Sequence, residues 1–106
     1  MTKEYLIQAD VHAIWIKIPI YRVWVNGELM CERTYWPNPE KLYIQENMIV
    51  ELSPGTHKVE LEQVDPTLGK IWINKIIVTD IEIDSGQQVT PKIIDYAKVQ
   101  EITFSV

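Results

Sequence analysis

The fold is decided by residues 41–64, which read KLYIQENMIVELSPGTHKVELEQV. In the first half, apolar residues occupy every second position except at Glu46, a pattern typical of a strand with one buried face. The second half alternates in the same way from His57 onward. Between them, Pro54 fixes the φ angle that a β-turn needs and Gly55 accepts a positive one, so the chain must reverse there. We therefore predict a hairpin with one apolar face, and we expect the rest of the chain to cover that face.

Alternating apolar and polar residues predict further strands along the chain. They cover residues 5–11, which we expect at a sheet edge, and residues 13–20, 21–25, 28–36, 71–83 and 102–106. In residues 13–20, four isoleucines share one face, and Pro19 marks an edge or a break because it cannot donate to a ladder. Asn26-Gly27 predicts a type I′ turn. The alternation slips near Asn74-Lys75, which indicates a β-bulge or a break into two strands.

No stretch combines a 3.6-residue period with helix caps. Ser85-Gly86 predicts another turn, and residues 89–98 fit no single element. The chain is therefore predicted to be all-β, an antiparallel two-sheet β-sandwich of jelly-roll-like type with roughly eight to nine strands. Its 106 residues match one domain, so residues 1–106 are predicted to form a single β-sandwich domain.

Composition and charge exclude several classes of partner. The formal net charge is -5, which disfavours nucleic acid because neutralising phosphates takes clustered Lys and Arg. No apolar run approaches the roughly 20 residues of a membrane span, so no membrane partner is expected. The single cysteine, Cys31, cannot form an internal disulfide, which fits a reducing compartment.

Candidate catalytic groups are few. A thiol nucleophile needs a base beside it, and the only imidazoles are His12 and His57. Cys31 lies in a strand pattern on the parity of Leu29, where a buried inert thiol is the commoner interpretation. Carboxylates could meet across strands, but charges that alternate outward usually form a solvated face. These carboxylates are Glu46, Glu51, Glu60 and Glu62. We predict that the chain is not an enzyme and has no catalytic residues.

Cofactor and metal motifs are equally sparse. The four glycines are isolated, so no phosphate-binding loop is predicted. Asp65, Asp80 and Asp84 could offer oxygens to calcium, but no stretch resembles an EF-hand loop. We predict no cofactor and no metal.

The aromatic residues are the strongest binding candidates. Four tryptophans and five tyrosines exceed what one small core commonly needs, and sugars and proteins both stack on aromatic faces. Trp36 stands directly before the Pro37-Asn38-Pro39 loop, where core packing is hard to arrange. Tyr35 and Tyr43 flank the same loop. The alternative interpretation is that tryptophans such as Trp24 and Trp72 simply fill the sandwich.

Three stretches look like strands of small carbohydrate-binding jelly-roll modules: VWVNGE at 23–28, LSPGTHKVEL at 52–61 and NKIIV at 74–78. This resemblance implies a β-sandwich and sugar binding. In the calcium-dependent xylan-binding members, the loop after the second of these strands is rich in Asp and Asn. Here that loop, residues 63–66, has one carboxylate, Asp65.

A second resemblance concerns residues 32–37, ERTYWP, followed by YIQE at 43–46 and the Pro-Gly turn. These look similar to small virion structural proteins of tailed phages, which use the same sandwich for capsid decoration or as a tail building block. The resemblance implies a virion location after assembly in the host cytoplasm.

The function expected from the sequence is that of a non-catalytic virion structural or assembly protein, a capsid decoration (cement) protein or a tail building block. Its partners would be other protein subunits in a homo-oligomer or lattice, with basic patches that meet its acidic surface. Trp36, Tyr35 and Tyr43 are the expected interface residues, with Arg33 as a pairing charge. The alternative is a carbohydrate-binding module in which Trp36 and Tyr43 stack on a glycan.

Overall fold

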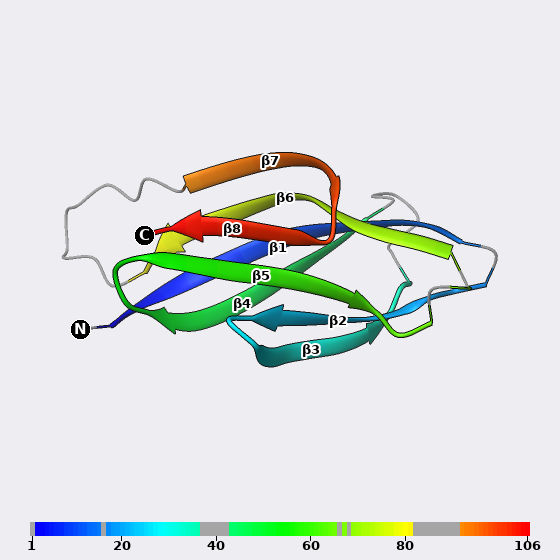
Figure 1. Cartoon of the computed structure of the whole chain (residues 1–106), viewed down its shortest axis with the longest axis horizontal. Coiled ribbons are helices and arrows are strands. Elements are labelled where there is room, and N and C mark those ends of the chain that lie inside the picture. Colours follow the sequence, from blue (N-terminus) through cyan, green and yellow to red (C-terminus); the bar gives the residue numbers. More distant parts are fainter. Residues whose placement is uncertain (1, 16, 37–42, 66, 68, 82–91) are drawn as a thin grey trace.

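A computed structural model describes residues 2–15, 17–36, 43–65, 67, 69–81 and 92–106 of the chain. In this part all regular structure is β-strand (Figure 1). The eight strands are β1 (Lys3–Trp15), β2 (Ile20–Val25), β3 (Glu28–Thr34), β4 (Ile44–Leu52), β5 (Thr56–Gln63), β6 (Gly69–Asp80), β7 (Lys92–Val99) and β8 (Glu101–Ser105). The predicted fold class is thereby confirmed.

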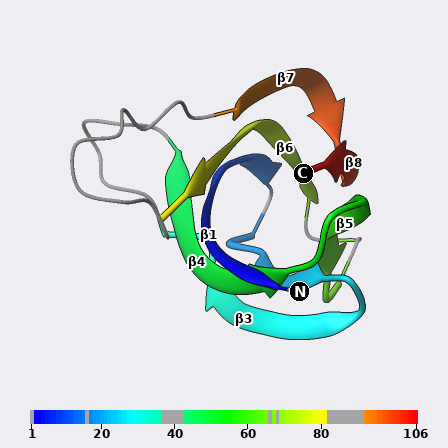
Figure 2. The ribbon, with the colours of Figure 1, turned by 90° about the vertical axis from the view of Figure 1, so that its left-hand side faces the viewer.

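The strands form two antiparallel sheets. Sheet A has the order β4-β1-β6-β7 and sheet B the order β3-β2-β5-β8. Viewed from one end, the two sheets curve around a common interior (Figure 2). Every second side chain of the central strands points into this interior, which holds Ile7, Val23, Val59, Ile73 and Ile76 with no exposed surface or almost none. The result is a two-sheet β-sandwich compatible with a jelly-roll-like module.

Strand β1 corrects two predictions. It lies between β4 and β6 in the middle of sheet A, not at an edge. It also continues to Trp15 with odd-numbered residues facing inward, so the next isoleucine, Ile14, points outward and is 66% exposed. Ile20 belongs to β2 and is likewise exposed. Ile14 and Ile20 therefore belong to different strands and do not share one strand face, because Pro19 lies where the chain passes from one sheet to the other. Ile16 lies outside the described residues.

The predicted hairpin of β4 and β5 is wrong. The chain does reverse at Gly55, which has a φ of 133°, but β4 pairs with β1 in sheet A and β5 pairs with β2 and β8 in sheet B. The inward parity was predicted correctly, since Met48, Leu52, Val59 and Leu61 are all buried. The apolar faces of β4 and β5 thus oppose each other across the core. Alternation identifies a strand's buried face and leaves open whether the next strand lies beside it or opposite it.

The other local signals correspond to observed features. Asn26 and Gly27 have φ angles of 51° and 80°, as a type I′ turn requires, and they connect β2 to β3. The slip near Asn74 is a bulge, because Asp10 pairs with Lys75 and the next residue, Val11, pairs with Ile73. The C-terminal alternation forms β8, with Ile102 and Phe104 buried. Part of the ambiguous stretch 89–98 forms β7. The predicted Ser85-Gly86 turn and the Pro37-Asn38-Pro39 loop lie outside the described residues.

Candidate functional site

Glu46, the one polar residue on the inward face of β4, is 3% exposed and lies where the two sheets approach. Its carboxylate accepts hydrogen bonds from groups on sheet B. The Tyr21 hydroxyl is 2.7 Å from Oε1 and the Cys31 Sγ is 3.2 Å from Oε2. Arg33 donates from Nε to Oε1 and from Nη2 to Oε2, the latter at 3.1 Å. This cluster joins β4 to β2 and β3 through one buried charge.

The cluster holds Glu46 ionised and keeps its neighbours protonated. Burial opposes the charge on Glu46, but hydrogen bonds from Arg33, Tyr21 and Cys31 together lower its pKa below the usual value. Burial, followed by the hydrogen bond to Glu46, raises the pKa of Tyr21 and raises that of Cys31 to about 12. The Cys31 thiol is therefore protonated near neutral pH, which is the opposite of what a nucleophile requires.

The four predicted site residues occupy different surroundings. Arg33 pairs with Glu46 of its own chain. Tyr35 is 1% exposed and packs in the interior, with its ring centroid 5.3 Å from that of Trp15. Trp36 is 73% exposed. Tyr43 stacks on His12, with ring centroids 5.3 Å apart. Of the predicted set, only Trp36 therefore presents most of its side chain to the surroundings, and Tyr35 in particular has no surface to offer a partner.

Large apolar side chains from both sheets are exposed at one end of the sandwich. We call this surface the apolar end and define it by Ile14, Trp15, Ile20, Trp36 and Val64, all of which are exposed. It lies where β1 ends and β2 begins, at the right of Figure 1.

Main-chain contacts hold the segments of the apolar end together. The Val64 amide donates to the Ile20 carbonyl at 3.0 Å, and the Tyr35 amide donates to the Pro19 carbonyl at 2.8 Å. Trp15 pairs with Gly69 between β1 and β6. The sequence identified Trp36 from its neighbouring prolines but placed Ile14 and Ile20 together on one strand face, so it did not reveal the apolar end.

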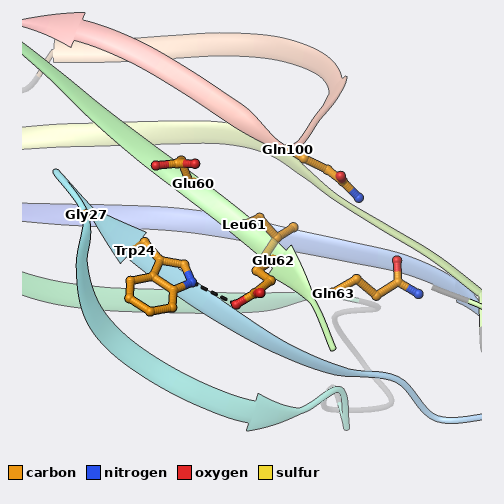
Figure 3. Close-up of a pocket in the computed structure, with 7 residues that line it drawn as sticks. All are labelled: Trp24, Gly27, Glu60, Leu61, Glu62, Gln63 and Gln100. Carbon is orange, nitrogen blue, oxygen red and sulfur yellow. Dashed lines mark hydrogen bonds between the residues drawn. The ribbon is translucent and has the colours of Figure 1, made fainter. Parts of the chain in front are cut away.

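A groove on sheet B contains Trp24, whose Nε1 donates to Glu62 at 3.0 Å (Figure 3). Its volume is about 560 Å³, and Glu60, Gln63 and Gln100 also line it. A second hollow of about 720 Å³ shares Gln63 and Gln100 and extends to Trp72. The two glutamines are held in place, because Gln63 Nε2 donates to the Gly69 carbonyl at 2.6 Å and Gln100 Nε2 to the Ile71 carbonyl at 2.9 Å.

The groove arises from strand length. β7 pairs with β6 only from Ile73 onward, and β8 pairs with β5 only as far as Glu60. The end of β5 and the start of β6 therefore extend beyond Gln100, the residue that connects β7 to β8. The Gln100 carbonyl accepts a hydrogen bond from the Leu61 amide at 2.7 Å. No sequence pattern marked Gln63 or Gln100, because the strand offsets that bring them together are set by the tertiary structure.

Two of the acidic residues considered for calcium, Asp65 and Asp80, have partners of their own. Asp65 accepts hydrogen bonds from the Thr67 amide and hydroxyl, and Asp80 pairs with Lys3 at 3.5 Å. Asp84 lies outside the described residues. Within the described part of the chain, no group of three or more His, Cys, Asp or Glu side chains is arranged to hold a metal ion.

Among the described residues, no helix has the length and apolar character to cross a membrane. Comparison with protein-family models, with curated proteins and with solved structures found no match.

Proposed function

We propose that this chain is a non-catalytic virion structural protein, a capsid decoration protein or tail building block that binds other protein subunits through its apolar end. The observation that carries the proposal is the exposure of five large apolar side chains at one end of a small sandwich. Exposed apolar clusters on proteins mark interaction sites, because burying them against a partner removes apolar surface from water. Trp36 is the expected anchor, since tryptophan is enriched among the residues that dominate binding energy.

The partner is expected to be a different subunit, with an apolar patch surrounded by basic residues. The net charge of -5 favours such a surface and disfavours another acidic one. In a symmetric particle many copies would bind at once, so each contact can be weak while the assembly is stable.

The test is recovery of the chain from purified virus particles. We expect a fixed ratio of this chain to the other subunits, and we expect Trp36→Ser to lower that ratio. Leu29→Ser is the matched control, because Leu29 is also exposed but lies near the opposite end of β3. Absence of the chain from particles would refute the proposal, as would equal incorporation of the two variants.

A second candidate function, carbohydrate binding, is favoured by the groove that contains Trp24 and by the second hollow, which Trp72 lines. Indole faces suit the apolar faces of sugar rings, and the anchored glutamines and Glu60 can bond hydroxyl groups. The groove, not the pair of Trp36 and Tyr43, supports this alternative. The carboxylates of Glu60 and Glu62 favour a neutral glycan over an anionic one.

Affinity electrophoresis in gels containing neutral xylan or mixed-linkage glucan tests this second function. Binding would slow the protein, and Trp24→Ala should abolish the retardation while Trp24→Phe preserves part of it. Trp36→Ala should leave it unchanged because Trp36 does not line the groove. Unretarded migration in both gels would count against sugar binding without affecting the assembly proposal.

A further inference from the structure

Strand β4 forms one edge of sheet A and has the features of a strand that pairs with another chain. It is nine residues long and pairs with β1 without a register shift, from Ile44 to Leu52. It contains no proline, and its only exposed charge is Glu51. Long, regular, weakly charged edges are the ones that accept a further strand.

The edge strands of sheet B are protected by comparison. β3 is interrupted by a register shift in its pairing with β2 and carries three exposed charges. These are Glu28, Glu32 and Arg33. β8 has only five residues. Charge, irregularity and short length are the usual means of preventing edge pairing, and β4 has only one exposed charge, no register shift and nine residues.

We propose that β4 pairs antiparallel with β4 of a second copy, around a two-fold axis at Ile49, so that two sheets A join into one continuous sheet. Ile49 is 63% exposed although it lies in the middle of a regular strand. This arrangement is isologous, since each copy contributes the same surface.

In this register the central part of β4, from Asn47 to Glu51, is complementary to itself. On the outer face, Ile49 meets its own symmetry mate and Asn47 meets Glu51 of the other copy. Asn47 Oδ1 already accepts from Gln8 on β1 at 3.0 Å, which directs its amide nitrogen toward the free edge where a carboxylate could accept. On the inner face, Met48 meets Val50 of the other copy. No like charges are opposed, and each apolar residue of these pairs meets an apolar one.

The structure also leaves room for the second strand beside β4. A hollow of about 410 Å³ lies between the start of β3 and the end of β4. Met30 of β3 and Val50 of β4 are among the residues that line it. The exposed Ile49 also lines this hollow, so a strand added to β4 would cover part of its apolar lining. Pairing would therefore bury apolar surface in addition to satisfying main-chain groups at the edge.

Charge gives this dimer a signature that differs from that of the apolar end. Two copies of net charge -5 repel each other, so salt should strengthen their association by screening the repulsion. Binding of the apolar end to a basic partner should instead weaken with salt. The dimer concerns another surface and does not depend on the proposed function.

The experiment is analytical ultracentrifugation of the full chain over a range of concentrations, at about 0.05 M and about 0.5 M sodium chloride. We expect a monomer–dimer equilibrium that shifts toward dimer at the higher salt. Ile49→Lys should weaken dimerisation about tenfold or more, because it opposes two like charges at the axis. Leu29→Lys is the matched control on the edge of β3, and Trp36→Ser tests the apolar end. Neither should change the equilibrium.

Cross-linking tests the register directly. In a Cys31→Ser background, Ile49→Cys should form an intermolecular disulfide on oxidation, whereas Gln45→Cys should not because its opposite residue in this register is Ser53. A monomer at every concentration would overturn the proposal. A dimer that resists Ile49→Lys and is lost in Trp36→Ser would overturn it too and would place the contact at the apolar end.

Discussion

At the scale of single residues, the break in alternation at Glu46 indicates a buried charge that needs partners. Burying a carboxylate in an apolar interior costs several kcal/mol unless it is paired and hydrogen-bonded. Here Arg33, Tyr21 and Cys31 supply the hydrogen bonds, all from the opposite sheet. The sequence revealed the exception at position 46 but not its partners, because these lie 13 to 25 residues away along the chain.

Arg33→Met should destabilise the fold by about 2–3 kcal/mol, because it leaves Glu46 buried with less compensation. We place the cost just below the range of about 3–5 kcal/mol for broken buried pairs, because the Arg33 side chain is half exposed. Urea denaturation monitored by tryptophan fluorescence measures this loss in the free energy of unfolding. The double variant Arg33→Met/Glu46→Leu should recover much of the loss. A change below about 0.5 kcal/mol in Arg33→Met would mean that the ion pair contributes little.

Glu46 should also make the fold sensitive to acid. Its pKa is lower in the folded chain than its ordinary value of 4.5, so the unfolded chain takes up a proton first as the pH falls. The stabilisation is complete above about pH 4.5 and is lost as the pH falls through the folded pKa. Unfolding free energies measured from pH 7 to pH 3 should fall less steeply in Glu46→Gln than in the native chain. Parallel curves for the two proteins would contradict this.

At the scale of elements, the inward faces of β4, β5 and β8 followed from side-chain parity, whereas the neighbours of these strands did not. The alternation in residues 41–64 predicted β4 and β5 correctly, yet the two strands lie in opposite sheets. Both arrangements bury the same residues, so a pattern of period two cannot distinguish them. The Asn26-Gly27 turn was more informative, because a two-residue type I′ turn leaves room only for a hairpin.

The start of β6 illustrates a requirement that arises only between elements. Gly69 pairs with Trp15, and a Cβ at position 69 would collide with the Ile14 carbonyl oxygen and lie 2.6 Å from the Trp15 Cα. Gly69→Ala should therefore destabilise the fold by about 2 kcal/mol or more, since main-chain atoms must move. Gly27→Ala is the comparison, because its Cβ would meet open space and only the positive φ is unfavourable. In thermal unfolding, the melting temperature of Gly69→Ala should be lower than that of Gly27→Ala. The reverse order would contradict the predicted clash.

At the scale of the whole molecule, most strand pairs join distant parts of the chain. β1 pairs with β4 and β6, and β5 pairs with β8. The long chain segments between paired strands must come together before the strands can pair, and this step is slow. Proteins rich in such distant contacts therefore fold in about milliseconds to seconds. Stopped-flow refolding monitored by tryptophan fluorescence should show a main phase slower than about a millisecond. A main phase in microseconds would mean that local structure, such as the β2–β3 hairpin, directs folding more than the topology implies.

The sequence by itself determined the fold class, the buried faces of β4, β5 and β8, the turn at Asn26-Gly27 and the break in alternation near Asn74. Each of these depends on a residue and its near neighbours, through side-chain alternation or the φ angles that Gly, Asn and Pro allow. The tertiary structure alone decided which sheet each strand joined, and with it the partners of Glu46, the apolar end, the groove at Gln63 and Gln100, and the position of β4 at an edge of sheet A. These features depend on contacts between segments far apart in the chain, and no local pattern of residues records them.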